Sequence, residues 1–324
     1  MAAPYFSNRI RVGRRAPDPP RTAIRAVQAA DLVVASGGAY MTDTWWWHAT
    51  GVLSLLSLAQ RLGKPTAMFG QGIGPLRQRA LRLQAGTVLP GLAALSLREE
   101  RIGRDLALAL GIRPGVVTAA GDDSLELMSE TSVADGHALG ANLRVSGYAG
   151  VEPIVAAAVM ELVLEAAAEF SAPIVALPVS RYPADADIAA IRALLGRKAR
   201  HTDIALDDLT APEALASAAA SCRAIVTGSY HAAVFGLAQG VPAVCLTKSG
   251  YYDAKFGGLR VQFPEACFVV SLDMSDYAAR IRDTILQAWH LPTPARACAR
   301  DTAMRLGNAG RSAYAQFRTT VEAA

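Results

Sequence analysis

Residues 227–258 read TGSYHAAVFGLAQGVPAVCLTKSGYYDAKFGG and place a histidine where a strand gives way to a helix. The apolar run 224–227 predicts a buried strand, and residues 230–239 predict a helix. His231 then falls in the first helical turn, where free backbone N–H groups and the helix dipole favour a phosphate or a carboxylate. This stretch therefore predicts an anion site at the end of a strand.

Working outward from this stretch, short apolar runs alternate with helix-length segments from residue 31 onward. This alternation predicts βα units and parallel sheets. We expect strands at 32–36, 66–69, 94–97, 116–119, 138–143, 174–179 and 267–270, and helices at 51–62, 77–89, 100–110, 153–170, 185–195, 274–289 and 294–321. The sequence TAPE at 210–213 predicts a capping box that starts a further helix.

The segment 129–137 is polar and lacks periodic apolar residues, so we expect it to be a linker. The predicted domains are therefore residues 1–132 and residues 133–324, the second ending in a helical region. Two successive parallel α/β domains imply a cleft between them, because ligands in open α/β sheets bind beyond the carboxyl ends of the strands.

The composition favours a folded protein that binds small anions. Apolar residues make up 52% of the 324 residues, and the net charge of +4 comes from scattered arginines, which favours small anionic ligands over nucleic acid. No apolar stretch approaches the roughly 20 residues that span a bilayer, and we expect a cytoplasmic protein without a transmembrane segment. The four cysteines are dispersed, which predicts reduced core thiols rather than a zinc site or disulfides.

Several segments, taken in order, resemble the polysaccharide pyruvyl transferase family. They are ADLVVASGGAYMTD, GKPTAMFGQGIGPL, LSLREERIGRDLALALG, AAGDDSLEL, GANLR and the histidine block. The resemblance implies an α/β fold with two Rossmann-like domains in a GT-B-like arrangement, the N-terminal one on the acceptor side and the C-terminal one on the donor side. The family opens with a strand, whereas this chain reaches its first clear strand only near Leu32, so we expect a shortened N-terminal domain.

The same resemblance implies transfer of a pyruvyl group from phosphoenolpyruvate to hydroxyls of a sugar, generally as a ketal. The matching histidine and arginines would lie in the active site, and no cofactor would be required. The partners would be a small anionic donor and a carbohydrate acceptor, with homo-oligomerisation left open.

Histidine suits a proton transfer in this chemistry, and cations suit the oxyanions of the donor. His231 is therefore the candidate general acid/base. The candidate donor-binding residues carry a positive charge or a neutral donor group: Arg144, Arg98, Lys255, Lys248, Ser229 and Tyr230. We expect the lysines on a loop at the rim of a pocket. Arg144 fits a domain-bridging ion pair equally well, and Arg98 fits an exposed helix start slightly better than a clamp.

Candidates in the N-terminal half follow the predicted strands. Gly37 and Gly38 would let a backbone approach a ligand, or they simply mark a turn. Gln71 opens the expected rigid loop 71–75, which faces the cleft or only connects elements. Asp123 would orient an acceptor hydroxyl, whereas a metal is disfavoured because no third ligand stands at suitable spacing.

Two further motifs have competing interpretations. The run WWWH at 45–48 would offer a stacking platform for a sugar, although tryptophans near the top of a domain more often seal its core or an oligomer interface. The triplet DAD at 185–187 is like a metal motif of some glycosyltransferases, but the opening turn of a helix explains it better.

The family pattern has an arginine two residues before the histidine, and here that position is Ser229. A serine cannot supply a charged bidentate fork. Two alternatives therefore remain open. One is a glycosyltransferase-like enzyme whose lysines and helix N-terminus hold the diphosphate of a nucleotide sugar, and the other is a non-catalytic carbohydrate-binding relative.

Overall fold

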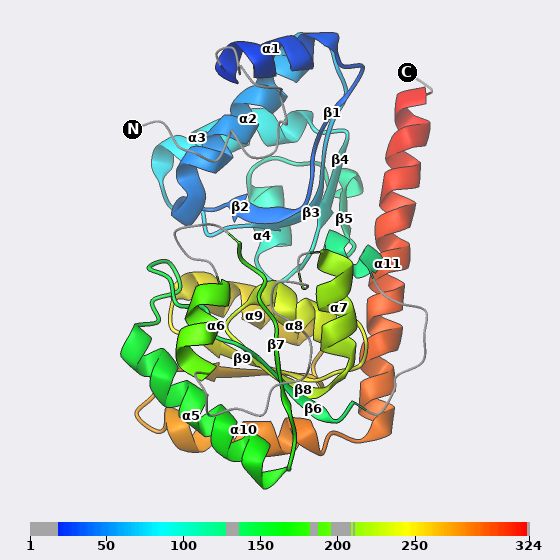
Figure 1. The fold of residues 1–324 in the computed structure, drawn as a ribbon. Helices are drawn as coiled ribbons and strands as arrows, with labels where there is room; N and C mark the ends of the chain where they lie inside the picture. Colours follow the sequence, from blue (N-terminus) through cyan, green and yellow to red (C-terminus); the bar gives the residue numbers. More distant parts are fainter. Residues whose placement is uncertain (1–18, 128–135, 182–186, 196–208, 210, 323–324) are drawn as a thin grey trace. The chain divides into compact units, whose positions relative to one another are not determined.

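The computed structural model describes residues 19–127, 136–181, 187–195, 209 and 211–322 (Figure 1). The chain divides into two compact units. Unit 1 comprises the residues up to Asp123 together with those from Asn308 onward, and unit 2 comprises Ser124–Gly307. The expected boundary after residue 132 lies outside the described residues. The end of the chain belongs to unit 1, whereas the sequence predicts the whole C-terminal helical region in the second domain.

Unit 1 contains a parallel sheet of order β1–β3–β4–β5, in which β2 also pairs with β3. The strands are β1 Val33–Ala35, β2 Gly38–Met41, β3 Thr66–Ile73, β4 Ala94–Leu97 and β5 Val117–Ala119. All eight residues of β3 are buried. Continuous burial of this kind is expected for a central strand that is covered on both faces.

Helices cover both faces of this sheet because successive side chains of a strand point to opposite sides. The helices are α1 Pro19–Ala29, α2 Trp46–Arg61, α3 Arg79–Val88, α4 Gly103–Ala109 and the final part of α11 Thr293–Glu322. Met68 of β3 packs in the cluster that includes Leu53 of α2 and Leu81 of α3. The next residue, Phe69, packs instead against Phe317 of α11, which explains why the chain end belongs to unit 1.

Unit 2 contains a second parallel sheet, of order β10–β9–β8–β6–β7. The strands are β6 Ala138–Asn142, β7 Ile174–Ala176, β8 Cys222–Thr227, β9 Ala243–Thr247 and β10 Cys267–Ser271. Counted from β6, this is the 2-1-3-4-5 order of flavodoxin-like sheets, so the direction of winding reverses between β6 and β8. The carboxyl ends of these two strands form the switch point of the unit.

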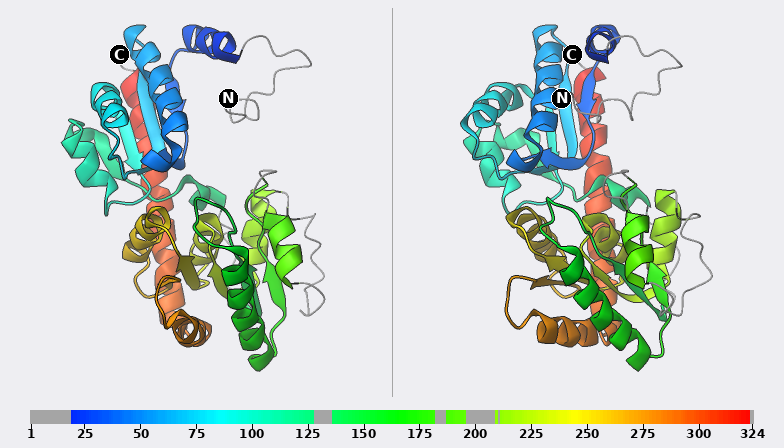
Figure 2. Two further views of the ribbon diagram at one scale, coloured as in Figure 1. Left: turned by 90° about the vertical axis from the view of Figure 1, so that its left-hand side faces the viewer. Right: turned by 60° about the vertical axis from the view of Figure 1, so that its left-hand side comes forward.

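The helices of unit 2 also cover both faces of their sheet (Figure 2). They are α5 Pro153–Glu169, α6 Asp187–Leu195, α7 Pro212–Ala220, α8 Tyr230–Leu237, α9 Gly250–Gln262, α10 Tyr277–Trp289 and the first part of α11. Helices α5, α6 and α10 share one apolar cluster with β6. Helices α7, α8 and α9 contribute to the two other clusters of the unit.

Three local predictions need correction. Strand β3 continues to Ile73, where we expected a loop at 71–75, because Gln71 pairs with both β2 and β4. Helix α2 begins at Trp46 rather than at residue 51. Helix α7 begins close to the expected place, but its N-cap is Ala211, which has no capping side chain, so the predicted capping box is wrong. Thr210 and Asp185 lie outside the described residues.

Each helix in the described part of the chain is too short or too polar to cross a lipid bilayer. Over the same residues, no three His, Cys, Asp or Glu side chains gather as they would around a metal ion.

The cysteines differ sharply in their expected reactivity. Cys222, Cys245 and Cys267 are free and buried, whereas Cys298 is exposed on α11. Burial raises the pKa of Cys222 to about 12 and that of Cys245 well above its usual value. Because the thiolate is the reactive form, we expect one thiol of the native protein to react rapidly with a disulfide reagent at neutral pH. All four should react in denaturant, and a second fast thiol in the native protein would contradict this burial.

Candidate functional site

The candidate site lies at the switch point of the unit 2 sheet. Asn142 ends β6 and Thr227 ends β8, and the two residues are paired in register. The Gly228 N–H donates to the Asn142 carbonyl at 2.8 Å, so the two strand ends are joined. In open parallel sheets, ligands bind in the crevice at such a point.

His231 stands at this point, as the sequence predicted. Strand β8 ends at Thr227 and helix α8 begins at Tyr230, so His231 is the second residue of the helix. Its imidazole is half-buried, and its ring centroid lies 5.6 Å from that of Tyr230 and 6.4 Å from that of Phe235. The histidine is therefore held by aromatic rings in the first turn of a helix.

Ser229 is the N-cap of α8 and is only 2% exposed. Its N–H donates to Thr227 Oγ1 at 2.8 Å. Its side chain makes no capping hydrogen bond to the helix. The first turn of α8 therefore receives no acceptor from its own N-cap side chain, which suits an anion as an external acceptor.

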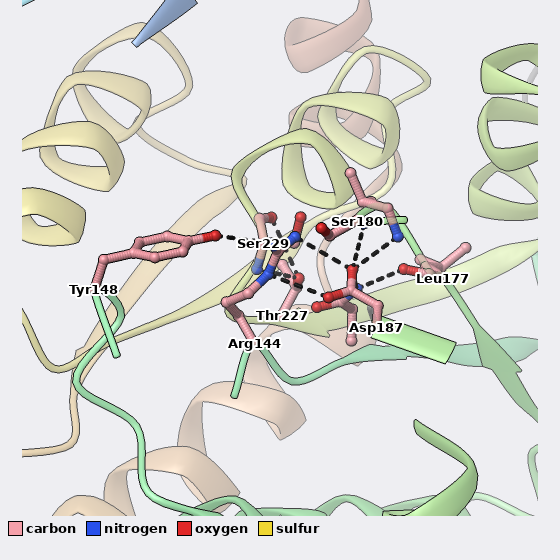
Figure 3. A network of polar contacts seen from close by, with 9 residues as sticks. Arg144, Tyr148, Leu177, Ser180, Asp187, Thr227 and Ser229 are labelled. Carbon is pink, nitrogen blue, oxygen red and sulfur yellow. Dashed lines mark hydrogen bonds and ion pairs between the residues drawn. The ribbon is translucent and has the colours of Figure 1, made fainter. Parts of the chain in front are cut away.

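Arg144 is buried two residues after β6 and forms a bidentate ion pair inside unit 2 (Figure 3). Its Nε lies 3.2 Å from Asp187 Oδ1, and its Nη2 donates to Asp187 Oδ2 at 3.2 Å. Its Nη1 donates to the Tyr148 hydroxyl at 2.9 Å. This ion pair lies within unit 2, because Asp187 belongs to the same unit, and it is therefore not the domain-bridging pair that the sequence left open. We do not propose Arg144 as an anion clamp for the donor, because Asp187 occupies the guanidinium edge that a donor carboxylate would need.

Asp187 is the functional-site residue that the sequence interpretation missed. It opens helix α6, as expected, but its carboxylate is 2% exposed and binds the ends of two strands. Its Oδ2 accepts from Asn142 Nδ2, from the Val179 N–H and from the Ser180 N–H, each at 2.8 Å. Asp187 thus ties β6, the segment after β7 and α6 together. The sequence interpretation assigned the triplet 185–187 to the opening turn of a helix and gave Asp187 no role in holding strand ends.

Lys255 lies within helix α9 rather than on the expected loop. The helix starts early because Ser249, its N-cap, accepts a hydrogen bond from the Tyr252 N–H. Lys255 Nζ lies 4.6 Å from the ring centroid of Tyr251, 5.1 Å from that of Tyr230 and 5.3 Å from that of Tyr252. These distances are those of cation–π contacts. Burial raises the pKa of Tyr252 well above its usual value, so its hydroxyl stays protonated at neutral pH.

Lys248 follows directly after β9, at the same edge of the sheet, and is half-buried. Its ammonium group makes no hydrogen bond or ion pair with any residue that the structure describes. A cation placed in this way can bind an anionic ligand without first breaking an internal ion pair.

The candidates from the N-terminal half lie in unit 1. Arg98 is 2% exposed and its Nη1 lies 3.6 Å from Asp122 Oδ2. The expected exposed helix start is therefore wrong at this residue, and α4 begins only at Gly103. Gln71 is fully buried, and its Nε2 donates to the Ser36 and Phe69 carbonyls.

Gly37 and Gly38 approach side chains of their own unit closely. The Gly37 N–H donates to Asp123 Oδ2 at 3.2 Å, and the Tyr314 hydroxyl donates to the same oxygen at 3.3 Å. A Cβ added at Gly38 would lie 2.6 Å from the Tyr40 ring. The two glycines are therefore needed for packing within unit 1, and Asp123 is held by donors from both ends of the chain.

The structure thus divides the sequence candidates between the units. Those at the carboxyl edge of the unit 2 sheet are His231, Ser229, Tyr230, Lys248, Lys255 and Arg144. Those of unit 1 are Arg98, Gln71, Gly37, Gly38 and Asp123.

Comparison with solved structures shows the fold class. A UDP-GlcNAc 2-epimerase from Neisseria meningitidis, bound to UDP-GlcNAc, is 14% identical with a TM-score of 0.59, and the match covers 96% of this chain and 84% of that chain. Alr3699/HepE from Anabaena, in complex with UDP, is 14% identical with a TM-score of 0.54, covering 94% and 82% of the two chains. These similarities confirm the predicted α/β fold of the GT-B class with two Rossmann-like units.

Comparison of the sequence gives the family. No curated protein matches this sequence significantly. The family model described as polysaccharide pyruvyl transferase matches residues 2–249, which include every strand of unit 1 and the unit 2 segment with Arg144, His231 and Lys248. The chain therefore belongs to the polysaccharide pyruvyl transferase family and is a transferase enzyme.

Proposed function

We propose that this transferase moves a pyruvyl group from phosphoenolpyruvate to hydroxyl groups of a carbohydrate acceptor, with His231 as general acid/base. The observation that carries the proposal is the position of His231 within the family-matched residues, in the first turn of α8 at the switch point of the unit 2 sheet. A cytoplasmic location and the lack of any required cofactor are part of the same proposal.

The proposed donor carries a phosphate and a carboxylate, which require fixed positive groups. The start of α8 offers backbone N–H groups and the positive end of a helix dipole. Lys248 adds a cation at the same sheet edge. Ser229, where the family has an arginine, contributes a neutral group, so we propose that Lys248 carries more of the electrostatic attraction in this chain.

The proposed reaction has a simple proton balance. Two sugar hydroxyl oxygens bond to C2 of the donor, and the bond between C2 and the phosphate oxygen breaks. The two hydroxyl groups release two protons. One proton is taken up by the CH₂ carbon, which becomes a methyl group, and the other leaves with inorganic phosphate. His231 would give or take a proton at one of these steps, which is the ordinary role of a positioned imidazole.

Arg144 and Asp187 have a supporting role in this proposal. Their ion pair and the hydrogen bonds of Asp187 hold the ends of β6 and β7 in place. The loop that carries Arg144 packs against Gly228. A Cβ added at Gly228 would lie 3.1 Å from the backbone nitrogen of Arg144. The pair thus positions the turn that precedes His231.

Donor binding can be tested by thermal unfolding of the full chain. Phosphoenolpyruvate at a hundredfold excess over its Kd should add about 2.7 kcal/mol to the free energy of unfolding, because it binds only the native state. Lys248→Gln should abolish most of the rise in melting temperature. Arg260→Gln, which removes an exposed positive charge from the last turn of α9, is the matched control and should retain it.

A nucleotide sugar is the second candidate donor, and one observation favours it. Two structural neighbours were solved with UDP-GlcNAc or UDP bound. UDP-GlcNAc is therefore the parallel arm of the unfolding experiment. A rise in melting temperature with UDP-GlcNAc and none with phosphoenolpyruvate would overturn the pyruvyl donor and favour glycosyl transfer.

A further inference from the structure

We propose that Trp46 and Trp47 form a stacking platform for the carbohydrate acceptor on unit 1. This inference rests on the carbohydrate acceptor of the proposed function and adds the residues that would bind it. The platform consists of these two side chains, with Trp45 and His48 beside them.

The exposure of the tryptophans is the first observation. Trp46 is 50% exposed and Trp47 is 37% exposed. Trp289, in contrast, stacks on Phe170 with a centroid distance of 4.4 Å and an interplanar angle of 8°. Large aromatic side chains grouped on a surface cost free energy in water unless a ligand or a partner covers them.

The arrangement of the rings is the second observation. The Trp46 and Trp47 rings meet at 89° with centroids 6.1 Å apart, and Trp45 meets Trp47 at 66° with centroids 5.3 Å apart. Edge-to-face contacts of this kind orient the rings. In such a contact the edge of one ring meets the face of the other, so the rings are held at a fixed angle. The exposed parts of Trp46 and Trp47 are what a ligand would contact.

The backbone under the platform is held in place. Trp45 ends a short 3-10 helix that begins at Asp43, and Trp46 begins α2. The Asp43 carboxylate accepts from the Arg77 N–H at 2.7 Å and from the Gln78 N–H at 3.1 Å. A platform that is ordered before binding loses little conformational entropy when the ligand arrives.

The platform also stands where ligands of α/β sheets bind. It follows the carboxyl end of β2, and ligands in open parallel sheets bind beyond the carboxyl ends of the strands. Two polar side chains border the platform: His48 follows Trp47 directly in the chain, and its ring stacks on that of Tyr40 with centroids 4.4 Å apart. A sugar ring has an apolar C–H face and a rim of hydroxyls, so it matches aromatic faces that are bordered by polar side chains.

The test measures glycan binding without any donor. Isothermal titration would use the full chain with galactotetraose, mannotetraose, cellotetraose and chitotetraose as probes. At least one should bind, and Trp46→Ala with Trp47→Ala should raise its Kd about tenfold, a loss of about 1.4 kcal/mol. Trp46→Phe should retain part of the affinity. Leu83→Ala, at an apolar residue of α3 that is 63% exposed, is the matched control and should bind like the native chain.

Two results would overturn the platform. One is the lack of binding of every probe to the native chain at millimolar concentration. The other is an unchanged Kd for the glycan in the double variant. If the double variant then has an altered oligomeric state, the two tryptophans form an interface between protein copies instead. Because the titration contains no phosphoenolpyruvate, its result is independent of the donor. A failed donor test with successful glycan binding would reject the pyruvyl donor and keep the platform.

Discussion

Replacement of His231 by alanine should lower the kcat of pyruvyl transfer by about 10²–10⁴-fold, the usual contribution of a general acid/base. The physical reason is that no other imidazole among the candidate residues stands at the switch point of the unit 2 sheet, at the start of α8. The fold should survive, because the imidazole is only half-buried. Release of inorganic phosphate from phosphoenolpyruvate, in the presence of a carbohydrate acceptor, measures the effect.

His290→Ala is the matched control, since His290 is exposed after α10 in the same unit. It should leave kcat unchanged. The pH–rate profiles of the native enzyme and of His231→Ala should distinguish a chemical role of His231 from a structural one. If the role is chemical, the variant loses the part of the profile that an imidazole contributes. A His231→Ala enzyme with native kcat would exclude this residue as the acid/base and leave the proposed mechanism without its central group.

Replacement of Asp187 by alanine should lower the free energy of unfolding by about 3–5 kcal/mol, the usual cost of breaking a buried ion pair. The change leaves the Arg144 guanidinium, 7% exposed, without its bidentate partner. It also removes one acceptor from the Asn142 amide and the carboxylate that accepts from the Val179 and Ser180 N–H groups. Urea denaturation of the transition that includes unit 2 measures the loss.

The control is Asp276→Ala, which removes a similar aspartate–arginine pair on the surface of α10. Asp276 and Arg280 are 50% and 54% exposed, so water replaces their interaction and stability should change little. Removing both buried charges with Asp187→Ala and Arg144→Met should recover part of the loss, because no unpaired charge is then buried. Equal stability of Asp187→Ala and the native chain would show that the ion pair does not hold the strand ends.

Much of the fold could be predicted because its elements have local signals. Strand β4 occurs at the predicted residues 94–97, and α5 begins at the predicted Pro153. Periodic apolar residues mark such elements wherever one face is buried. Strand β2 was missed, because its four residues, Gly38–Met41, carry no strand pattern and are ordered by pairing with β3.

The candidate site could be predicted only in part. The position of His231 follows from a short strand, a turn and a helix that are adjacent in sequence, so local pattern was sufficient. The partner of Arg144 is 43 residues away in the chain, and no pattern within a helix or strand connects the two. Lys255 was placed on a loop because glycine and tyrosine residues suggested one, whereas the Ser249 cap and packing extend α9 through it.

The amino-acid sequence determined the α/β class, the family and the place of His231, since each depends on residue order along the chain and on short-range periodicity. Only the tertiary structure decided which charged side chains have an internal partner. Arg144 and Arg98 are residues of the type that binds anions. Each is nevertheless buried beside an aspartate, Asp187 or Asp122, which is its internal partner. Lys248 retains an ammonium group without an internal partner among the described residues. The physical reason is that a buried charge requires an opposite charge nearby, and which charges become neighbours depends on the packing of strands that are far apart in sequence.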